Sequence, residues 1–189
     1  MSEAVSALPH APYSGIVELS EAGLTGMITL RGDLASAPVA AAVLAATGAA
    51  VPDIRRLTMG DSGKAAWMSP DELLLIVPYG GVSARLQSMS AAFGDAFATA
   101  ADVSDARAMI SVTGAQARDV LAKICPVDFA DFAVGEVRRT RAAQVAAALW
   151  REDEETWSII CFRSVAHYMW DMVQTVARPG SEVGLYRKS

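Results

Sequence analysis

The chain alternates short apolar runs with segments of helical periodicity, and glycine and proline mark the joints between them. Val82, Leu86, Met89 and Phe93 recur at the spacing of one helix face, which predicts an amphipathic helix. An alanine-rich segment ends at Gly48, and glycine is typical just beyond the C-terminus of a helix. The elements predicted for the first half are strands at residues 27–30, 64–68 and 72–77 and helices at 34–46 and 79–93.

The same order of elements returns in the second half. A glycine closes the first strand, a loop with a proline follows the first helix, and an acidic turn at residues 152–155 precedes the last strand. Residues 137–150 are compatible with one long strand or with a pair of strands. The other elements predicted here are strands at residues 109–112 and 156–162 and helices at 115–124 and 163–177.

Matching positions in the two halves lie at nearly constant separations. The pairs are Ile28 and Ile110 at 82 residues, Gly32 and Gly114 at 82, Trp67 and Trp150 at 83, and Leu75 and Ile160 at 85. An ordered set of this kind favours an internal duplication over chance. We therefore predict an α+β fold with two pseudo-repeated βαββα-like halves, antiparallel sheets and helices packed on them.

The N-terminal residues have the composition of an arm. Prolines and glycines punctuate them, and only residues 16–19 could pair as a short strand. Such an arm, which carries Leu8 and Tyr13, either docks on a neighbouring subunit or is disordered. The predicted organisation is an arm at residues 1–25, halves at 26–98 and 99–180, and a C-terminal tail at 181–189.

Composition narrows the class of protein. Apolar residues make up 52% of the chain and charged residues 20%, and the mean hydropathy is +0.28, which is more apolar than a typical free-standing domain. The most apolar stretch, residues 39–51, is too short to cross a bilayer, so we expect no membrane association. Either a partner covers extra apolar surface, or alanine enrichment alone explains the high apolar content.

Charge and cysteine content exclude further classes. The net charge is −5 and the basic residues form no continuous stripe, which argues against a nucleic-acid partner. Cys125 and Cys161 are far apart among apolar neighbours and form no CxxC motif. The first 14 residues lack the pattern of a secretory signal. A cytoplasmic protein with free thiols is expected.

Candidate catalytic groups are few. One of the two histidines, His10, lies in the arm, and the other, His167, lies about 200° from the centre of the apolar stripe of the last helix. His167 is therefore expected to be a solvated or interface histidine. Trp170, about 140° from that stripe, is expected to be partly exposed, as a satellite core contact or an interface anchor. We predict no catalytic, cofactor-binding or metal-binding residue, and Trp170, His167 and Tyr13 are the candidates for a partner interface.

Two charged segments do not indicate one particular function. Arg138, Arg139 and Arg141 alternate along a predicted strand, where they form a solvated face or contact the carboxylates or phosphates of a partner. The acidic run at residues 152–155 lacks the glycine and the spacing of a calcium loop, so we expect a solvated hairpin tip.

The second half resembles the folate-binding module of the aminomethyltransferases, in which a strand closes on a glycine and an aspartate stands seven residues after a helix leucine. The residues that carry this resemblance are Asp102-Val103-Ser104, Ile110 to Gly114, Ala117, Leu121, Asp128 and Gly135. Within that superfamily the chain resembles the gamma-subunit family of heterotetrameric sarcosine oxidase. The matching stretches are residues 67–75, 122–128, 148–153 and 163–170.

The resemblance implies a non-catalytic structural subunit. Its enzyme would oxidatively demethylate sarcosine to glycine, with tetrahydrofolate as one-carbon acceptor and hydrogen peroxide as product. The alpha, beta and delta subunits would be its partners and would carry the FAD, FMN, NAD and zinc, and this chain would hold no cofactor.

The resemblance also bears on Asp128, which matches the folate-binding aspartate of the aminomethyltransferases. Val127 replaces the usual neighbouring asparagine, and the chain has about half the length of an aminomethyltransferase. We therefore expect a loop-capping role for Asp128, with a remnant of a folate site as the lesser alternative. A stand-alone folate-binding or one-carbon-transfer protein, or a small regulatory binding module, are the competing functions.

Overall fold

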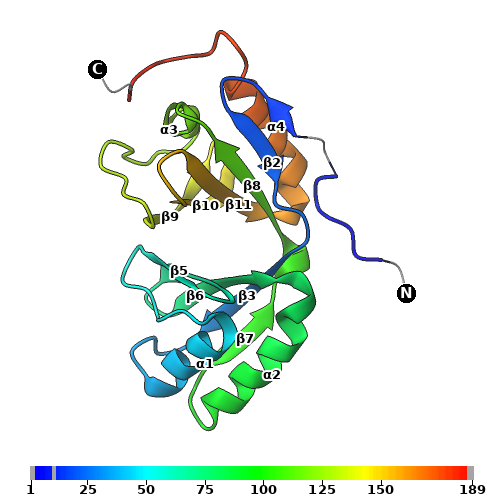
Figure 1. Cartoon of the computed structure of the whole chain (residues 1–189), viewed down its shortest axis with the longest axis vertical. Helices are drawn as coiled ribbons and strands as arrows, with labels where there is room; N and C mark the ends of the chain where they lie inside the picture. Colours follow the sequence, from blue (N-terminus) through cyan, green and yellow to red (C-terminus); the bar gives the residue numbers. More distant parts are fainter. Residues whose placement is uncertain (1–2, 10–11, 187–189) are drawn as a thin grey trace. The chain divides into compact units, whose positions relative to one another are not determined.

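A computed structural model describes residues 3–9 and 12–186 of the chain. Its contacts divide the chain into two compact units. The first unit is residues 24–105, and the second unit combines the residues before 24 with those from 106 onward. Each unit contains one antiparallel sheet with helices packed against it (Figure 1).

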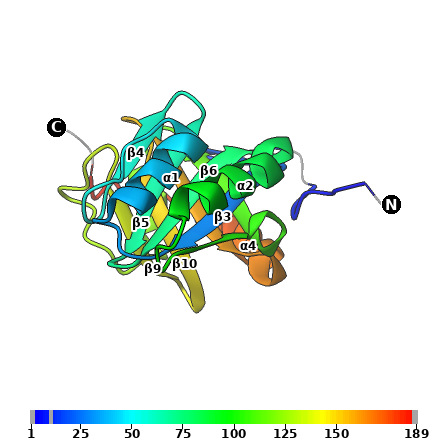
Figure 2. The same cartoon turned by 90° about the horizontal axis from the view of Figure 1, so that it is seen from below.

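The first unit has a five-stranded sheet in the order β4-β5-β6-β3-β7. Helices α1 and α2 lie on the same face of this sheet (Figure 2). The chain runs through β3 (Thr25–Arg31), α1 (Ala37–Thr47), β4 (Leu57–Gly60), β5 (Gly63–Ser69), β6 (Glu72–Pro78), the 3-10 turn η1 (Tyr79–Gly81), α2 (Val82–Phe93) and β7 (Thr99–Asp102). Gly48 ends α1 in the left-handed conformation, with φ of 72°, as its position in the sequence indicated.

The second unit has a six-stranded sheet in the order β1-β2-β8-β11-β10-β9. A 3-10 turn, η2 (Ser104–Ala106), leads from β7 to β8. The elements of the sheet and its helices are β1 (Tyr13–Ser14), β2 (Glu18–Glu21), β8 (Arg107–Thr113), α3 (Ala117–Ala122), β9 (Val137–Ala142), β10 (Val145–Arg151), β11 (Thr156–Phe162), η3 (Arg163–Val165) and α4 (Ala166–Val176).

The α+β fold with two repeated halves is confirmed. β3 and β8 begin at residues 25 and 107, 82 residues apart, and β5 and β10 begin at 63 and 145, also 82 apart. From β6 and β11 onward the separation is 84 residues, because these strands begin at 72 and 156. β4 is a strand that was not predicted, and it pairs with β5. Residues 137–150 form the pair of strands β9 and β10, one of the two arrangements compatible with the sequence.

Two of the residue pairs that suggested the repeat are out of register by one position. Trp67 lies opposite Leu73, and the residue 84 positions after Leu73 is Trp157, which lies opposite Arg151. The counterpart of Trp67 is therefore Arg151 and not Trp150. By the same separation the counterpart of Leu75 is Ile159.

The two sheets exchange a strand. β2 precedes β3 in the chain but pairs with β8, and β7 precedes β8 but pairs with β3 (Figure 1). Each sheet therefore depends on a strand from the other part of the sequence. The unit boundaries consequently fall at residues 23/24 and 105/106, whereas the sequence suggested boundaries at 25/26 and 98/99.

The N-terminal residues pack against their own chain. Leu8 and Leu19 have no exposed surface and Val17 is 3% exposed, and all three belong to the core of the second unit. The C-terminal residues are tied down as well, because Lys123 Nζ donates to the carbonyl oxygen of Ser181 at 2.5 Å. Leu8, Val17, Leu19 and Ser181 therefore contribute to the second unit.

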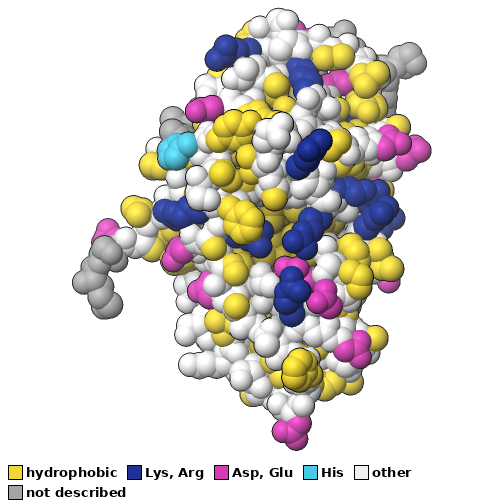
Figure 3. Space-filling view, turned by 180° about the vertical axis from the view of Figure 1, so that it is seen from behind, with side chains coloured by type: hydrophobic (Ala, Val, Ile, Leu, Met, Phe, Trp, Pro, Cys, Tyr) yellow, Lys and Arg dark blue, Asp and Glu magenta, His cyan; other side chains and the backbone are white. Residues whose placement is uncertain are grey.

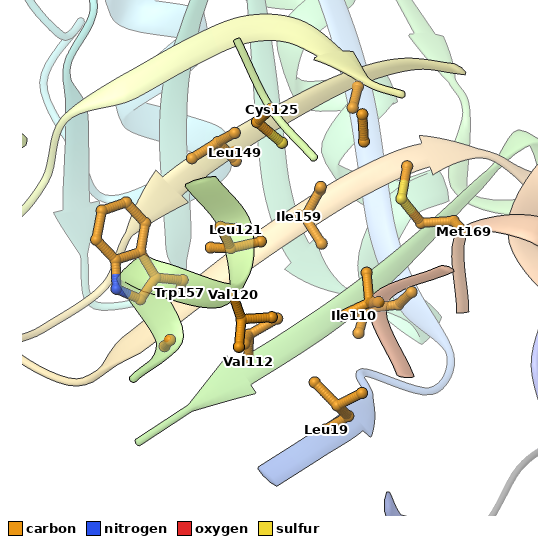
Figure 4. Packing of buried hydrophobic residues seen from close by; sticks show 14 of the residues in the cluster. Leu19, Ile110, Val112, Val120, Leu121, Cys125, Leu149, Trp157, Ile159 and Met169 are labelled. Atoms are coloured by element: carbon orange, nitrogen blue, oxygen red, sulfur yellow. The ribbon is translucent and has the colours of Figure 1, made fainter. Parts of the chain in front are cut away.

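Alternating burial along β8 shows how the core of the second unit forms. Ala108, Ile110 and Val112 are at most 3% exposed and point into this core, as expected for a half-buried strand. Figure 4 shows the same core, with Leu19, Val120 and Met169 entering from β2, α3 and α4. The sheet and both helices therefore share one apolar interior, which fixes the loops at their ends.

Candidate functional site

Asp128 caps its own loop. Its Oδ1 accepts a hydrogen bond from the backbone N–H of Ala130 at 2.9 Å, an arrangement in which an aspartate side chain stabilises a turn. The side chain is exposed. This geometry is the loop-capping role expected from the sequence.

Aromatic side chains fill the space next to the Asp128 loop. Phe129 has no exposed surface and Phe132 is 2% exposed. Their rings lie 5.5 and 4.8 Å from the ring of Trp157, measured between centroids. Aromatic pairs at these distances stabilise a core beyond their buried area. The loop is thus anchored by its own side chains.

Arg151, at the end of β10, organises the acidic turn. It is 8% exposed, and its guanidinium donates to the carbonyl oxygens of Phe132, Asp153 and Glu154 at 3.1, 3.0 and 2.8 Å. It also bonds Glu154 Oε2 at 2.8 Å. The acidic run is therefore a turn held by a buried arginine. Asp153, Glu154 and Glu155 are exposed as predicted, but Glu152 is partly buried and accepts hydrogen bonds from Trp150 Nε1 and Ser158 Oγ. No sequence pattern indicated this role of Arg151.

Asp153 contributes to the same turn. Hydrogen bonds from the backbone N–H groups of Glu155 and Thr156, at 2.9 and 2.8 Å, hold the pKa of Asp153 below its usual value. Since hydrogen bonds to the ionised form favour ionisation, Asp153 keeps its charge to lower pH than an aspartate without these bonds.

A cavity of about 620 Å³ lies beside this turn in the second unit. Its size is within the range of about 300–1,000 Å³ that is typical of binding pockets. None of the sequence-predicted site residues lines it. The residues that line it are Gly114, Ala115, Gln116, Arg118, Asp119, Arg151, Glu154, Glu155, Trp157 and Tyr186.

Gly114 lines this cavity. Its φ of 132° is a conformation that side-chain-bearing residues rarely adopt, and its N–H donates to the carbonyl oxygen of Glu155 at 3.0 Å. The end of β8 is thereby joined to the acidic turn. The glycine that marked the sequence repeat is thus explained by its backbone conformation in this half.

Trp170 is less exposed than the helical-wheel argument predicted. It is 4% exposed and lies in the core of the second unit. The buried face of α4 is Ala166, Met169, Trp170 and Val173, at the i, i+3, i+4 and i+7 positions of one helix face. The buried face of α4 is thus rotated toward Trp170 relative to the apolar stripe predicted from the sequence.

The other two candidate interface residues differ from one another in exposure. Tyr13, in β1, is partly buried and packs against the core of its own unit. His167 is exposed on α4, and Figure 3 shows a histidine side chain in cyan at the surface. Tyr168 next to it is 48% exposed. His10 lies outside the described residues.

The three arginines of β9 have different environments. Arg139 and Arg141 are exposed on one face of this edge strand, while Arg138 is partly buried. Arg138 forms an ion pair with Glu136, and its guanidinium lies 5.3 Å from the centroid of the Phe132 ring. Arg138 therefore has a structural role beside the Asp128 loop, and the strand is not a uniformly solvated row of arginines.

Both cysteines are buried and protonated. Burial raises the pKa of the Cys125 thiol to about 12 and that of Cys161 to about 11, and nearby Arg107 partly opposes the second shift. The thiolate is the reactive form of cysteine. At pH 8 a thiol of pKa 11 is ionised in roughly one molecule in a thousand.

We therefore expect neither cysteine to react with a disulfide reagent such as dithiobisnitrobenzoate in the folded protein at pH 8. Both thiols should react within minutes once a denaturant unfolds the chain. Released thionitrobenzoate, measured by absorbance, gives the count in each state. Labelling of either cysteine without denaturant would contradict the burial that raises both pKa values.

Residues 3–9 and 12–186 contain no group of three or more histidine, cysteine or acidic side chains placed to hold a metal ion. Within the same ranges, no helix combines the length and apolar character that crossing a bilayer requires.

Comparison with known proteins identifies the family. Residues 31–178 match the model of the sarcosine oxidase gamma subunit family. The sarcosine oxidase subunit gamma of Corynebacterium sp. (strain U-96) is 33% identical over 148 residues, which are 76% of this chain and 71% of that protein. The corresponding subunit from Arthrobacter sp. is 29% identical over 181 residues, covering 92% of this chain and 88% of the relative.

Solved structures agree with this assignment. A chain of the heterotetrameric sarcosine oxidase from Corynebacterium sp. U-96 is similar at a TM-score of 0.78 with 28% identity, over 88% of this chain and 87% of that one. Aminomethyltransferase T of the glycine cleavage system from Bartonella henselae shares the fold at a TM-score of 0.65 with 14% identity, over 85% of this chain and 46% of that one. The chain belongs to the sarcosine oxidase gamma subunit family.

Proposed function

We propose that this chain is the non-catalytic gamma subunit of a heterotetrameric sarcosine oxidase. The observation that carries the proposal is the similarity to a chain of such an enzyme, which extends over 88% of this chain and 87% of its counterpart. Similarity over nearly the full length of both chains favours the same position in the same kind of assembly.

The side chains that could take part in chemistry are instead used to hold the fold together, which supports a structural function. Asp128 accepts a hydrogen bond from Ala130, and Arg151 donates hydrogen bonds to the acidic turn. Both cysteine thiols are buried and protonated. We infer that the chain supports the assembly and that the chemistry resides in its partners. Of the candidate interface residues, we place the contact at His167, because Trp170 and Tyr13 pack against their own core.

The enzyme would oxidatively demethylate sarcosine to glycine in the cytoplasm, as part of one-carbon metabolism, with tetrahydrofolate as acceptor and hydrogen peroxide as product. The alpha, beta and delta subunits would be the partners and would hold FAD, FMN, NAD and zinc. These assignments follow the family resemblance found in the sequence.

Co-purification tests the proposal. The four subunits are co-expressed with an affinity tag on the alpha subunit, and we expect this chain to be retained in stoichiometric amount. Binding stabilises a folded protein in proportion to its affinity, so the isolated chain should gain roughly 5–10 °C in melting temperature when the other subunits are added. A chain that stays unbound, with an unchanged melting temperature, would contradict the subunit role.

Titration with tetrahydrofolate tests the alternative function, a stand-alone folate-binding protein. We expect the isolated chain to give no heat at near-millimolar ligand, because the Asp128 carboxylate is engaged by Ala130 and does not line the cavity. A heat signal that disappears in Asp128→Ala would instead support a folate-binding protein.

A further inference from the structure

The cavity of the second unit contains a buried carboxylate with few partners. Asp119, in α3, is 5% exposed and lines the cavity. Within the described part of the chain, this carboxylate accepts one hydrogen bond, from the backbone N–H of Tyr186 at 3.2 Å. A buried carboxylate is normally stabilised by an opposite charge or by several hydrogen bonds. Asp119 therefore has unused capacity to accept hydrogen bonds.

A second acceptor lies on the same wall. Gln116 precedes α3 and lines the cavity, and its Oε1 is buried without a hydrogen-bond partner among residues 3–9 and 12–186. Leaving such an acceptor without a partner costs about 1–3 kcal/mol. Gln116 and Asp119 are three residues apart, so two underused oxygen acceptors lie close together.

The positive groups on the wall are engaged elsewhere. Arg151 uses its guanidinium on the carbonyl oxygens of the acidic turn and the Phe132 loop. Arg118 donates to the carbonyl oxygen of Ala130 at 3.4 Å, and its guanidinium lies 5.6 Å from the centroid of the Tyr186 ring. The cavity therefore presents acceptors, and the exposed carboxylate of Glu155 adds negative charge to its lining, while that of Glu154 is paired with Arg151.

We propose that this cavity is a binding site for a cation that donates N–H hydrogen bonds, an ammonium or guanidinium group. Its N–H groups would bond the Asp119 carboxylate and Gln116 Oε1, and its charge would be favoured by the carboxylates of Asp119 and Glu155 in the lining. The volume of about 620 Å³ accommodates a lysine or arginine side chain with its neighbouring residues, or a free amine of similar size. This site is additional to the subunit role proposed above.

Titration of the full-length chain with methylguanidinium chloride tests the site. We expect saturable shifts of the Gln116 side-chain amide and the Tyr186 backbone amide in ¹H–¹⁵N spectra. Tetramethylammonium has the same charge but no N–H group and should bind at least fivefold more weakly. Equal binding of tetramethylammonium, or shifts of the same amides by acetate instead, would overturn the proposal.

Three variants assign the binding to the named acceptors. Asp119→Asn removes the charge and keeps an acceptor for Tyr186, and Gln116→Met removes the buried oxygen at similar volume. Each should weaken methylguanidinium binding at least fivefold, while the exposed carboxylate variant Asp171→Asn should bind like the original chain. Normal binding by a folded Asp119→Asn or Gln116→Met variant would contradict the site.

A calorimetric titration of the assembled complex identifies the source of the cation. If a basic side chain of a partner fills the cavity, methylguanidinium should bind the isolated chain and not the complex. If the site serves a free amine, both should bind with similar affinity. Either result supports the site and distinguishes the two sources, whereas no binding to the isolated chain would refute it.

Discussion

Replacing Leu19 by alanine should lower the free energy of unfolding of the second unit by about 2–5 kcal/mol, the usual range for a buried leucine. Leu19 has no exposed surface, lies in the core of this unit and pairs with Val112 through β2 and β8. The truncation therefore removes packing at the strand that the N-terminal segment contributes.

Urea denaturation followed by tryptophan fluorescence measures this effect. Trp150, Trp157 and Trp170 lie in the second unit and Trp67 in the first, so the signal reports mainly on the second unit. Leu24→Ala is the matched control, because Leu24 is 43% exposed and its truncation should change stability by about 0.5 kcal/mol or less.

The two outcomes separate two roles of the N-terminal segment. If it belongs to the sheet of its own chain, Leu19→Ala destabilises the isolated chain in the absence of any partner. If it were an arm that docks on a neighbour, the isolated chain would keep its stability and only the complex would weaken. A change below about 0.5 kcal/mol in the isolated chain would therefore contradict the pairing of β2 with β8.

Local patterns predicted most helices and strands, because their signals lie within the elements themselves. The apolar run of β6 and the helical spacing of α2 were recognisable from the sequence. The pair β9 and β10 could not be separated from one long strand, since the residue with positive φ in their turn is Ala143 (φ 48°) and the usual turn glycine is missing.

The strand exchange was not predictable in the same way. β7 is four residues long with only one partly buried position, and β2 is equally short, so neither carries a clear alternating pattern. Their partners are set by contacts between residues distant in the sequence, which local periodicity does not encode. The family, in contrast, was predictable, because it rests on the order and spacing of several motifs.

Site residues were predicted less well than elements. Asp128 was located by its spacing from Leu121, and its loop-capping contact follows from a local preference of aspartate. Asp119 and Gln116 were not predicted, because they line a cavity together with Tyr186, which is distant in the sequence. The structural role of Arg151 was not predicted either, since an arginine at a strand end is ordinarily exposed.

Replacing Arg151 by methionine should lower the free energy of unfolding of the second unit by about 3 kcal/mol. The variant keeps much of the apolar volume over the Trp157 ring but leaves the carbonyl oxygens of Phe132, Asp153 and Glu154 without this donor. Removing one partner from a buried polar network costs about 1–3 kcal/mol for each group left unsatisfied, and water entering the turn should offset part of the sum.

The ion pair of Arg151 should contribute little to that effect. The Glu154 side chain is 75% exposed, and exposed ion pairs stabilise proteins by about 0–1 kcal/mol, so Glu154→Gln should be nearly neutral. Arg151→Lys should recover less than half of the loss, because an ammonium group cannot match the planar fork of donors. The same urea titration measures all three variants. Full recovery by lysine would show that charge and not the fork stabilises the turn, and a large loss in Glu154→Gln would assign the stability to the ion pair.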